Sequence, residues 1–125
     1  MDISVKRVAG EYAVHRLAPD AAVPESVWIS HFVTVSRSVD ELSIITDAGI
    51  HVDAHSTVGP WLAYRVVGAI DFSVTGVMSA LTEPLADAGL GILGISTYDT
   101  DYILVHADSG EAAEITWRAA GIGVR

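Results

Sequence analysis

The chain has 125 residues, half of them apolar, no cysteine and a formal net charge of −9. This length allows one domain, or two very small units that share a core. Without cysteine, disulfides, thiolate catalysis and zinc–thiolate sites are excluded, and an intracellular location is the default. So negative a field repels nucleic acid, and the apolar runs are too short to span a membrane. Residues 1–7 hold no signal-peptide core, so we expect a cytoplasmic protein with neither nucleic acid nor membrane as partner.

Alternating apolar and polar residues predict four strands in the first half of the chain. They are Asp2–Val8, Tyr12–Leu17, Phe32–Ser36 and Glu41–Thr46. A turn at Arg37–Asp40 joins the last two strands into a hairpin. A short helix is predicted at Glu25–His31, with Val27 and Trp28 facing inward. Residues 47–59 have no pattern that predicts a helix or a strand.

The strongest helix pattern in the chain covers Ser73–Ala88, where apolar residues recur at three- and four-residue steps. Asp71 or Ser73 is expected to cap its first turn, because each side chain offers an oxygen to free N–H groups. Gly89 suits the left-handed conformation that ends a helix. Pro84 lies inside the pattern and predicts a kink or a break there.

The remaining elements of the second half are four strands and a second, shorter helix. The strands are Leu62–Val67, Gly91–Thr97, Tyr102–Ala107 and a short last strand at Ile122–Val124, and the second and third of them form a two-strand unit with its bend at Ser96–Asp101. Large apolar residues on both faces of the middle two strands predict a sheet that is covered on both sides. The second helix starts at Asp108–Glu111 with a capping-box pattern and ends at Gly121. Its expected buried face holds Ala112, Ile115 and Ala119.

The second half therefore has the order strand, helix, strand, strand, helix, strand, which is the ferredoxin-like plan. The first half repeats this order imperfectly, with a shorter helix. Ser36–Ile45 aligns with Ser96–Val105, each with a leading serine and an acidic residue just before an apolar strand. We predict an α+β fold of two tandem ferredoxin-like (βαββαβ) units, residues 1–60 and 61–125, with antiparallel sheets and helices on one face.

Four segments resemble the ACT-domain family, small regulatory modules that bind amino acids in metabolic enzymes. They read YAVHRL at Tyr12–Leu17, DELSII at Asp40–Ile45, DFSVTGV at Asp71–Val77 and ISTYDTDYILV at Ile95–Val105. The resemblance is closest to stand-alone bacterial ACT-like proteins related to the aspartate kinase regulatory region and to the eukaryotic cytosolic arginine sensors. It implies two ACT-like units packed side by side, with an amino-acid-sized ligand at their junction. Any regulated enzyme would be a separate chain.

This resemblance implies two ligand-binding stretches. They contain Asp71, Phe72, Ser73, Val74, Thr75 and Gly76, with Ser96, Thr97, Tyr98 and Asp99 nearby. The common family pattern has a glycine at the helix start, whereas we expect Gly76 to sit further into this helix.

The chemistry of these residues suits an amino acid. Free N–H groups at a helix start near Ser73–Gly76 favour a carboxylate. Asp71, Asp99 or Asp101 can accept a charge-assisted hydrogen bond from an ammonium group. The alternative is structural: Asp71 caps the helix, and Asp99 bonds its own backbone in a turn. For Asp101 both interpretations stay open.

No pattern in the chain predicts a metal, a cofactor or catalysis. His51, Asp53 and His55 share a face on a strand, but no further ligand accompanies them, so we expect a solvated connection. There is no nucleophile elbow, phosphate loop or dinucleotide fingerprint. His15 and His106 fall in strands, where an ordinary hydrogen-bonded histidine is expected.

The sequence therefore predicts a sensor or regulatory protein that binds a small amino acid, forms a homodimer and catalyses no reaction. One alternative is a ligand-free interaction module whose apolar sheet faces mediate dimerisation. Another is a small enzyme that acts on an amino-acid-like substrate.

Overall fold

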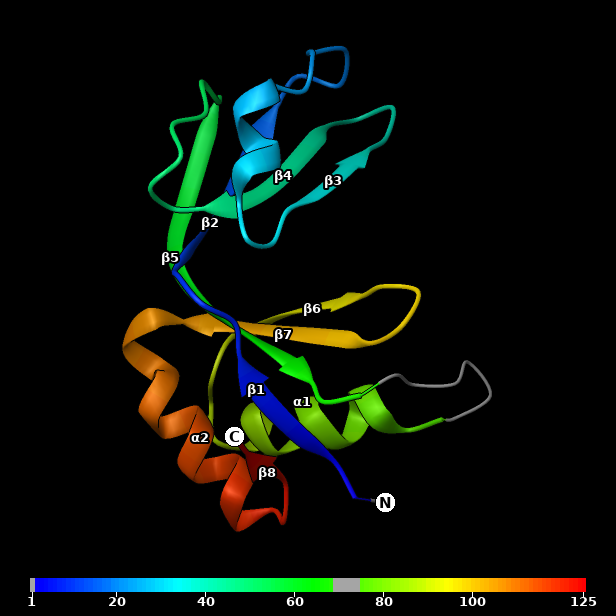
Figure 1. Cartoon of the computed structure of the whole chain (residues 1–125), viewed down its shortest axis with the longest axis vertical. Helices are drawn as coiled ribbons and strands as arrows, with labels where there is room; N and C mark the ends of the chain where they lie inside the picture. The colour runs from blue at the N-terminus through cyan, green and yellow to red at the C-terminus, as the bar shows by residue number, and fades with distance from the viewer. Residues whose placement is uncertain (1, 69–74) are drawn as a thin grey trace. The chain divides into compact units, whose positions relative to one another are not determined.

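The computed structural model describes residues 2–68 and 75–125 (Figure 1). Two compact units are present: residues 9–61, here called the N-terminal unit, and residues 2–8 with 62–125, here called the C-terminal unit. Strand β5 (Ser56–Val66) contributes to both. The predicted α+β class is confirmed. No helix in the described parts is long and apolar enough to cross a membrane.

The sheet of the C-terminal unit has the strand order β6-β7-β5-β1-β8. The bounds are Ser4–Arg7 for β1, Ile92–Ser96 for β6, Asp101–His106 for β7 and Gly123–Val124 for β8. Strand β1 pairs antiparallel with the end of β5, with Val5 opposite Val66, and parallel with β8. This first strand lies in the C-terminal unit, whereas the sequence analysis grouped it with residues 1–60.

Helices α1 (Val77–Asp87) and α2 (Gly110–Ala119) cover one face of this sheet (Figure 1). A short 3₁₀ helix, η2 (Ala107–Ser109), leads into α2. From β5 onward the element order is the ferredoxin-like one that the sequence predicts. The core between helices and sheet consists of Ile3, Val5, Leu62, Tyr64, Val66, Val77, Leu81, Leu85, Ile103, Val105, Ala113, Trp117 and Ile122.

Trp117 joins the two helices to the sheet. Its fully buried indole N–H donates to the backbone carbonyl of Leu81 in α1 at 2.9 Å. Its ring meets the ring of Tyr64 edge-on, with centroids 4.9 Å apart, a favourable aromatic geometry. The Tyr64 hydroxyl donates in turn to Glu114 at 2.6 Å. One side chain of α2 therefore contacts both α1 and β5.

The predicted buried face of α2 is wrong. Gly110, Ala113 and Trp117 face the core. Ile115 is 58% exposed, and the two alanines predicted beside it are exposed as well. The physical reason is Trp117, the largest apolar side chain of this helix, which is fully buried and finds a hydrogen-bond partner for its N–H inside the core.

Both helices end as predicted, at a glycine. Gly89 and Gly121 have φ angles of 77° and 84°, the left-handed region that an L side chain rarely adopts. After α1, the N–H of Leu90 donates to the carbonyl of Leu85 at 2.9 Å, and an equivalent bond of the same length closes α2. This is the Schellman motif, which satisfies carbonyls of the last turn.

The other end of α1 differs from the prediction. The helix begins at Val77 and not at Ser73, and its first backbone bond runs from the N–H of Ala80 to the carbonyl of Gly76 at 2.9 Å. The helix also continues through Pro84 to Asp87, so the break that the sequence analysis allowed at this proline does not occur.

The N-terminal unit has the strand order β3-β4-β2-β5 and no α-helix among its elements. The bounds are Tyr12–Leu17 for β2, Thr34–Arg37 for β3, Leu42–Asp47 for β4 and Glu25–Ile29 for the 3₁₀ helix η1. Val27 of η1 is buried as predicted, but Trp28 is 59% exposed, so its predicted inward position is wrong. Strand β5 begins at Ser56, inside the stretch that had no readable pattern.

The predicted hairpins at β3–β4 and β6–β7 are confirmed, and their bends close alike. The N–H of Ser38 donates to the carbonyl of Glu41 at 2.9 Å, and the N–H of Thr97 donates to that of Thr100 at 2.9 Å. Ser38 is thus equivalent to Thr97, one residue away from the predicted alignment, which placed it over Tyr98. The internal duplication itself stays a prediction.

Replacing Trp117 with phenylalanine should lower the free energy of unfolding by about 1–3 kcal/mol, because it removes the bond to Leu81 and leaves a small cavity. Urea denaturation measures the change. The matched control on the same helix is Ile115→Ala, which should cost less than about 0.5 kcal/mol because that side chain is exposed. A larger cost for Ile115→Ala than for Trp117→Phe would contradict this assignment of the helix face.

Candidate functional site

Six of the ten predicted ligand-binding residues fall in the described parts of the chain. The other four, Asp71, Phe72, Ser73 and Val74, lie outside the described residues. Thr75 and Gly76 are exposed and directly precede α1. Gly76 is the N-cap residue, with a φ of 83°. The glycine therefore stands at the helix start, as in the family pattern, and the expectation that it sits further into the helix is wrong.

This helix start changes which backbone groups are available to a ligand. Because the first helical bond is donated by Ala80, the amide groups of Val77, Met78 and Ser79 have no partner within the helix. No side chain of a described residue caps this start. The free N–H groups that favour a carboxylate thus lie one turn later in the chain than the sequence analysis placed them.

Ser96 ends β6, and Thr97, Tyr98 and Asp99 form the bend that follows; all four are exposed. The hydroxyl of Thr97 donates to the carbonyl of Thr100 at 3.1 Å and accepts the N–H of Thr100 at 3.4 Å. The side-chain bonds described within this bend are therefore those of Thr97, whereas the sequence analysis assigned turn chemistry to Asp99.

Asp101, which the sequence left open, pairs with Ser96 across the hairpin. The Ser96 hydroxyl donates to one carboxylate oxygen of Asp101 at 2.7 Å. Side chains alternate along a strand, so Asp101 shares its face with Ile103 and Val105, which belong to the core under the helices. The carboxylate therefore lies on the helix side of the sheet, with its second oxygen available for another donor.

The structure brings the bend, the end of β5 and the start of α1 to one edge of the sheet (Figure 1). A Cβ built on Gly94 would lie 3.3 Å from the sulfur of Met78, so the first turn of α1 packs directly on β6. The Thr100 hydroxyl donates to the carbonyl of Val66 at 3.1 Å, which ties the bend to the strand that leads into residues 69–74. We call this edge the bend edge.

Sequence reasoning missed the residues that hold the bend edge together. Thr100 is 6% exposed, and its bond to Val66 spans separate strands. A signal was present in the spacing of Thr97 and Thr100, two hydroxyl residues at the ends of a four-residue bend. Gly94 gave a second signal, because a glycine inside a strand often marks the close approach of another segment.

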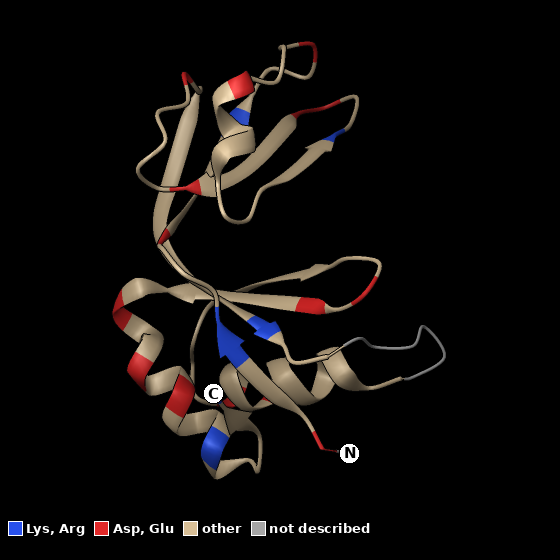
Figure 2. Cartoon of the chain, in the orientation of Figure 1, with Lys and Arg blue, Asp and Glu red and all other residues tan. Residues whose placement is uncertain are grey.

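Basic residues of the C-terminal unit gather on β1 and on the end of β5, and acidic residues recur along α2 (Figure 2). Lys6 lies directly opposite Arg65 in the β1–β5 pair. Like charges in this position repel each other, and neither has an ion pair with another described residue. Val5, Tyr64 and Val66 belong to the core under the helices, so the two basic side chains between them lie on the opposite face of the sheet.

The N-terminal unit has a cavity of about 240 Å³, lined by Arg16, Leu17, Ala18 and His55. The Arg16 guanidinium forms an ion pair with Glu41. A hydrogen bond from Ser43 and the charge of Arg16 lower the pKa of Glu41. Because Glu41 already binds this cation, we assign the pair to structure and not to a ligand.

His15 is a buried titratable side chain of the N-terminal unit. Its Nδ1 lies 2.9 Å from the hydroxyl oxygen of Thr57, and its Nε2 lies 3.0 Å from that of Thr46. Burial lowers the pKa of His15, and the nearby His51 lowers it further. The expected ordinary hydrogen-bonded histidine is confirmed. In the described residues, no group of three or more His, Cys, Asp or Glu side chains is close enough to hold a metal ion.

Comparison with known proteins is informative for most of the chain. The family model described as "ACT domain" matches residues 56–116, and a second family model, described as an N-terminal domain, matches residues 10–48. No curated protein matches.

Solved structures give the fold over the whole chain. A protein from Agobacterium tumefaciens is 29% identical, with a TM-score of 0.92 over 100% of this chain and 93% of its own. A Vibrio cholerae protein of unknown function, described as a possible transport protein, is 15% identical, with a TM-score of 0.73 over 96% and 91%. The ligand-free regulatory subunit of aspartate kinase from Thermus thermophilus is 13% identical, with a TM-score of 0.66 over 96% and 99%.

Residues 56–116 therefore match the ACT-domain family. The fold of the chain is shared with the regulatory subunits of aspartate kinases. The resemblance noted in the sequence is confirmed.

The environment of His15 predicts how stability depends on pH. Its folded-state pKa is below the ordinary value of 6.5, so in mildly acid solution the unfolded chain binds a proton more readily than the folded one. The stability contributed by neutral His15 is complete above pH 6.5 and is lost as the pH falls towards the folded-state pKa.

Urea denaturation between pH 7.5 and pH 5.5 measures this loss. His15→Gln removes the titrating group while keeping polar atoms near the two threonines, so its stability should fall less over the same range. Parallel curves for the two proteins would show that His15 does not cause the loss.

Proposed function

We propose that this chain is a regulatory protein that binds an amino acid and has no catalytic activity of its own. The observation that carries the proposal is the ACT-domain match, because residues 56–116 include every residue predicted to bind the ligand. The likeness to an aspartate kinase regulatory subunit supports a regulatory role.

The bend edge of the C-terminal unit is the proposed binding site. Its chemistry suits a zwitterion, with backbone donors on one side and a carboxylate on the other. The amide groups of Val77–Ser79 would hold the ligand carboxylate. Asp101, which keeps one oxygen free of Ser96, would accept the ammonium group, with Asp71 as a second candidate.

We also propose that the chain forms a homodimer in the cytoplasm and acts on a separate protein, as a sensor or as a regulator. A ligand-free interaction module is the competing proposal, and the exposed side chain of Tyr98 on the bend is compatible with it.

A thermal-shift screen against the twenty common amino acids, each at millimolar concentration, tests the proposal. A ligand that binds only the folded state adds about 2.7 kcal/mol of stability at a hundredfold excess over its Kd. For a chain of this size that gain raises Tm by roughly 10 °C. The protein should be refolded first, so that any ligand carried through purification is removed.

The matched variants are Asp101→Asn, in the proposed site, and Asp20→Asn, an exposed residue of the N-terminal unit. Asp101→Asn should abolish the shift produced by the best ligand, and Asp20→Asn should leave it unchanged. A flat screen with refolded protein would reject amino-acid binding and favour the interaction module. Turnover of the bound amino acid would reject the statement that the chain has no catalytic activity.

A further inference from the structure

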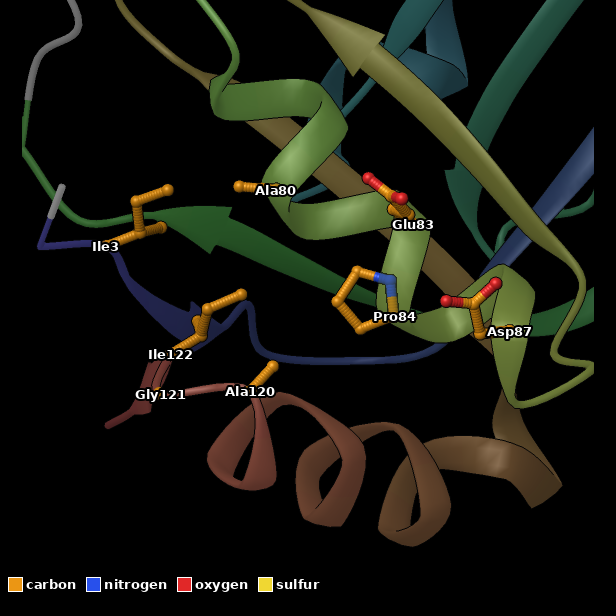
Figure 3. Close-up of a pocket in the computed structure, with 8 residues that line it drawn as sticks. All are labelled: Ile3, Ala80, Glu83, Pro84, Asp87, Ala120, Gly121 and Ile122. Atoms are coloured by element: carbon orange, nitrogen blue, oxygen red, sulfur yellow. The ribbon is translucent and has the colours of Figure 1, made fainter.

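A groove of about 410 Å³ lies at the C-terminal end of α1, at the opposite end of this helix from Gly76. One wall is α1 itself, through Ala80, Glu83, Pro84 and Asp87. The facing wall is the chain that leaves α2, with Ala120 and Ile122, and Figure 3 shows these residues across from the ring of Pro84. A groove of this volume is within the range of small-molecule sites.

The acidic side chains of this groove stand where a helix least favours them. Glu83 and Asp87 are one turn apart on α1, so their charges repel each other. Both also lie in the last two turns, where the helix dipole is already negative. No basic residue lines the groove, and neither carboxylate forms an ion pair with a described residue.

One backbone feature adds to this negative potential. Pro84 has no N–H, so the carbonyl of Ala80 lacks the donor that an ordinary helix would supply, and both residues line the groove. Helix α2 also ends beside the groove, at Ala119, but the charge of Arg118 in its last turn offsets the negative end of that helix.

The rest of the surface is apolar. Ile3 and Ile122 line the groove together with the Pro84 ring. Hydrocarbon can pack on such a surface, while a charged group bound at its end would be held by the carboxylates. A polyanion would be repelled by the two carboxylates. A bare metal ion would leave the apolar wall without a partner.

We propose that this groove binds a small organic cation, namely a primary ammonium or a guanidinium group on a short alkyl stem. The cationic group lies between Glu83 and Asp87, near the Ala80 carbonyl, and the stem packs against Ile122 and Pro84. This site shares no residue with the bend edge, so it does not depend on the amino-acid site proposed above.

The test is an amide chemical-shift titration of the whole chain with n-pentylammonium and, separately, n-butylguanidinium. Saturable shifts should concentrate at Ala80, Gly121 and Ile122. The neutral analogue 1-pentanol should bind at least about tenfold more weakly, because it lacks the charge-assisted bonds. Shifts that do not saturate, or equal binding of 1-pentanol, would overturn the proposal.

Two variants separate a shaped site from general attraction to an acidic protein. Glu83→Gln with Asp87→Asn keeps the shape and should weaken cation binding at least about tenfold. The control, Asp20→Asn with Glu25→Gln, makes the same change in net charge at exposed positions of the other unit and should leave binding unchanged. Ala120→Phe keeps both carboxylates but fills the groove, and it should abolish binding. An equal loss in the control, or unchanged binding by Ala120→Phe, would contradict a groove site.

Discussion

The C-terminal unit depends on the position of one indole ring. Trp117 is fully buried, donates its N–H to the Leu81 carbonyl and packs edge-on against Tyr64. An indole buried without a hydrogen-bond partner would cost roughly 1–3 kcal/mol, so α2 fits the core only in the rotation that places its N–H beside Leu81. Because Leu81 belongs to α1, the same bond fixes one helix against the other. The sheet and both helices are thereby held as one body.

The packing of these helices on the sheet fixes the positions of the backbone donors and of the carboxylate that a ligand could contact. With α1 held on the sheet, its first turn packs on β6 through Met78 and Gly94. The bend after β6 is tied to β5 by the bond from Thr100 to Val66. The free amide groups of α1 and the Asp101 carboxylate consequently face the helix side of the same edge.

Much of the fold was readable from the sequence, because local chemistry decides it. Gly89 and Gly121 end their helices, since only glycine adopts the left-handed conformation cheaply. The hairpins followed from alternating residues between turn signals. Errors arose where a tertiary contact overrides the local pattern. Ile115 looks core-facing by spacing, but the larger Trp117 turns the helix away from it.

The candidate site was readable only in part. Its residues were selected by family resemblance, and the helix start was placed at Ser73 because a serine is a good cap. The helix begins after Gly76 instead, so the free amide groups shift by a turn. The bond from Thr100 to Val66 joins residues far apart in the chain, and no local pattern could have revealed it.

The most direct test of the account is amide hydrogen–deuterium exchange, followed by mass spectrometry, with and without the amino acid that stabilises the protein best. Binding at the bend edge predicts slower exchange in peptides that cover residues 69–80 and 94–101, with little change in residues 9–55. Protection confined to the N-terminal unit, or no protection in the presence of a stabilising amino acid, would contradict an amino-acid site at this edge.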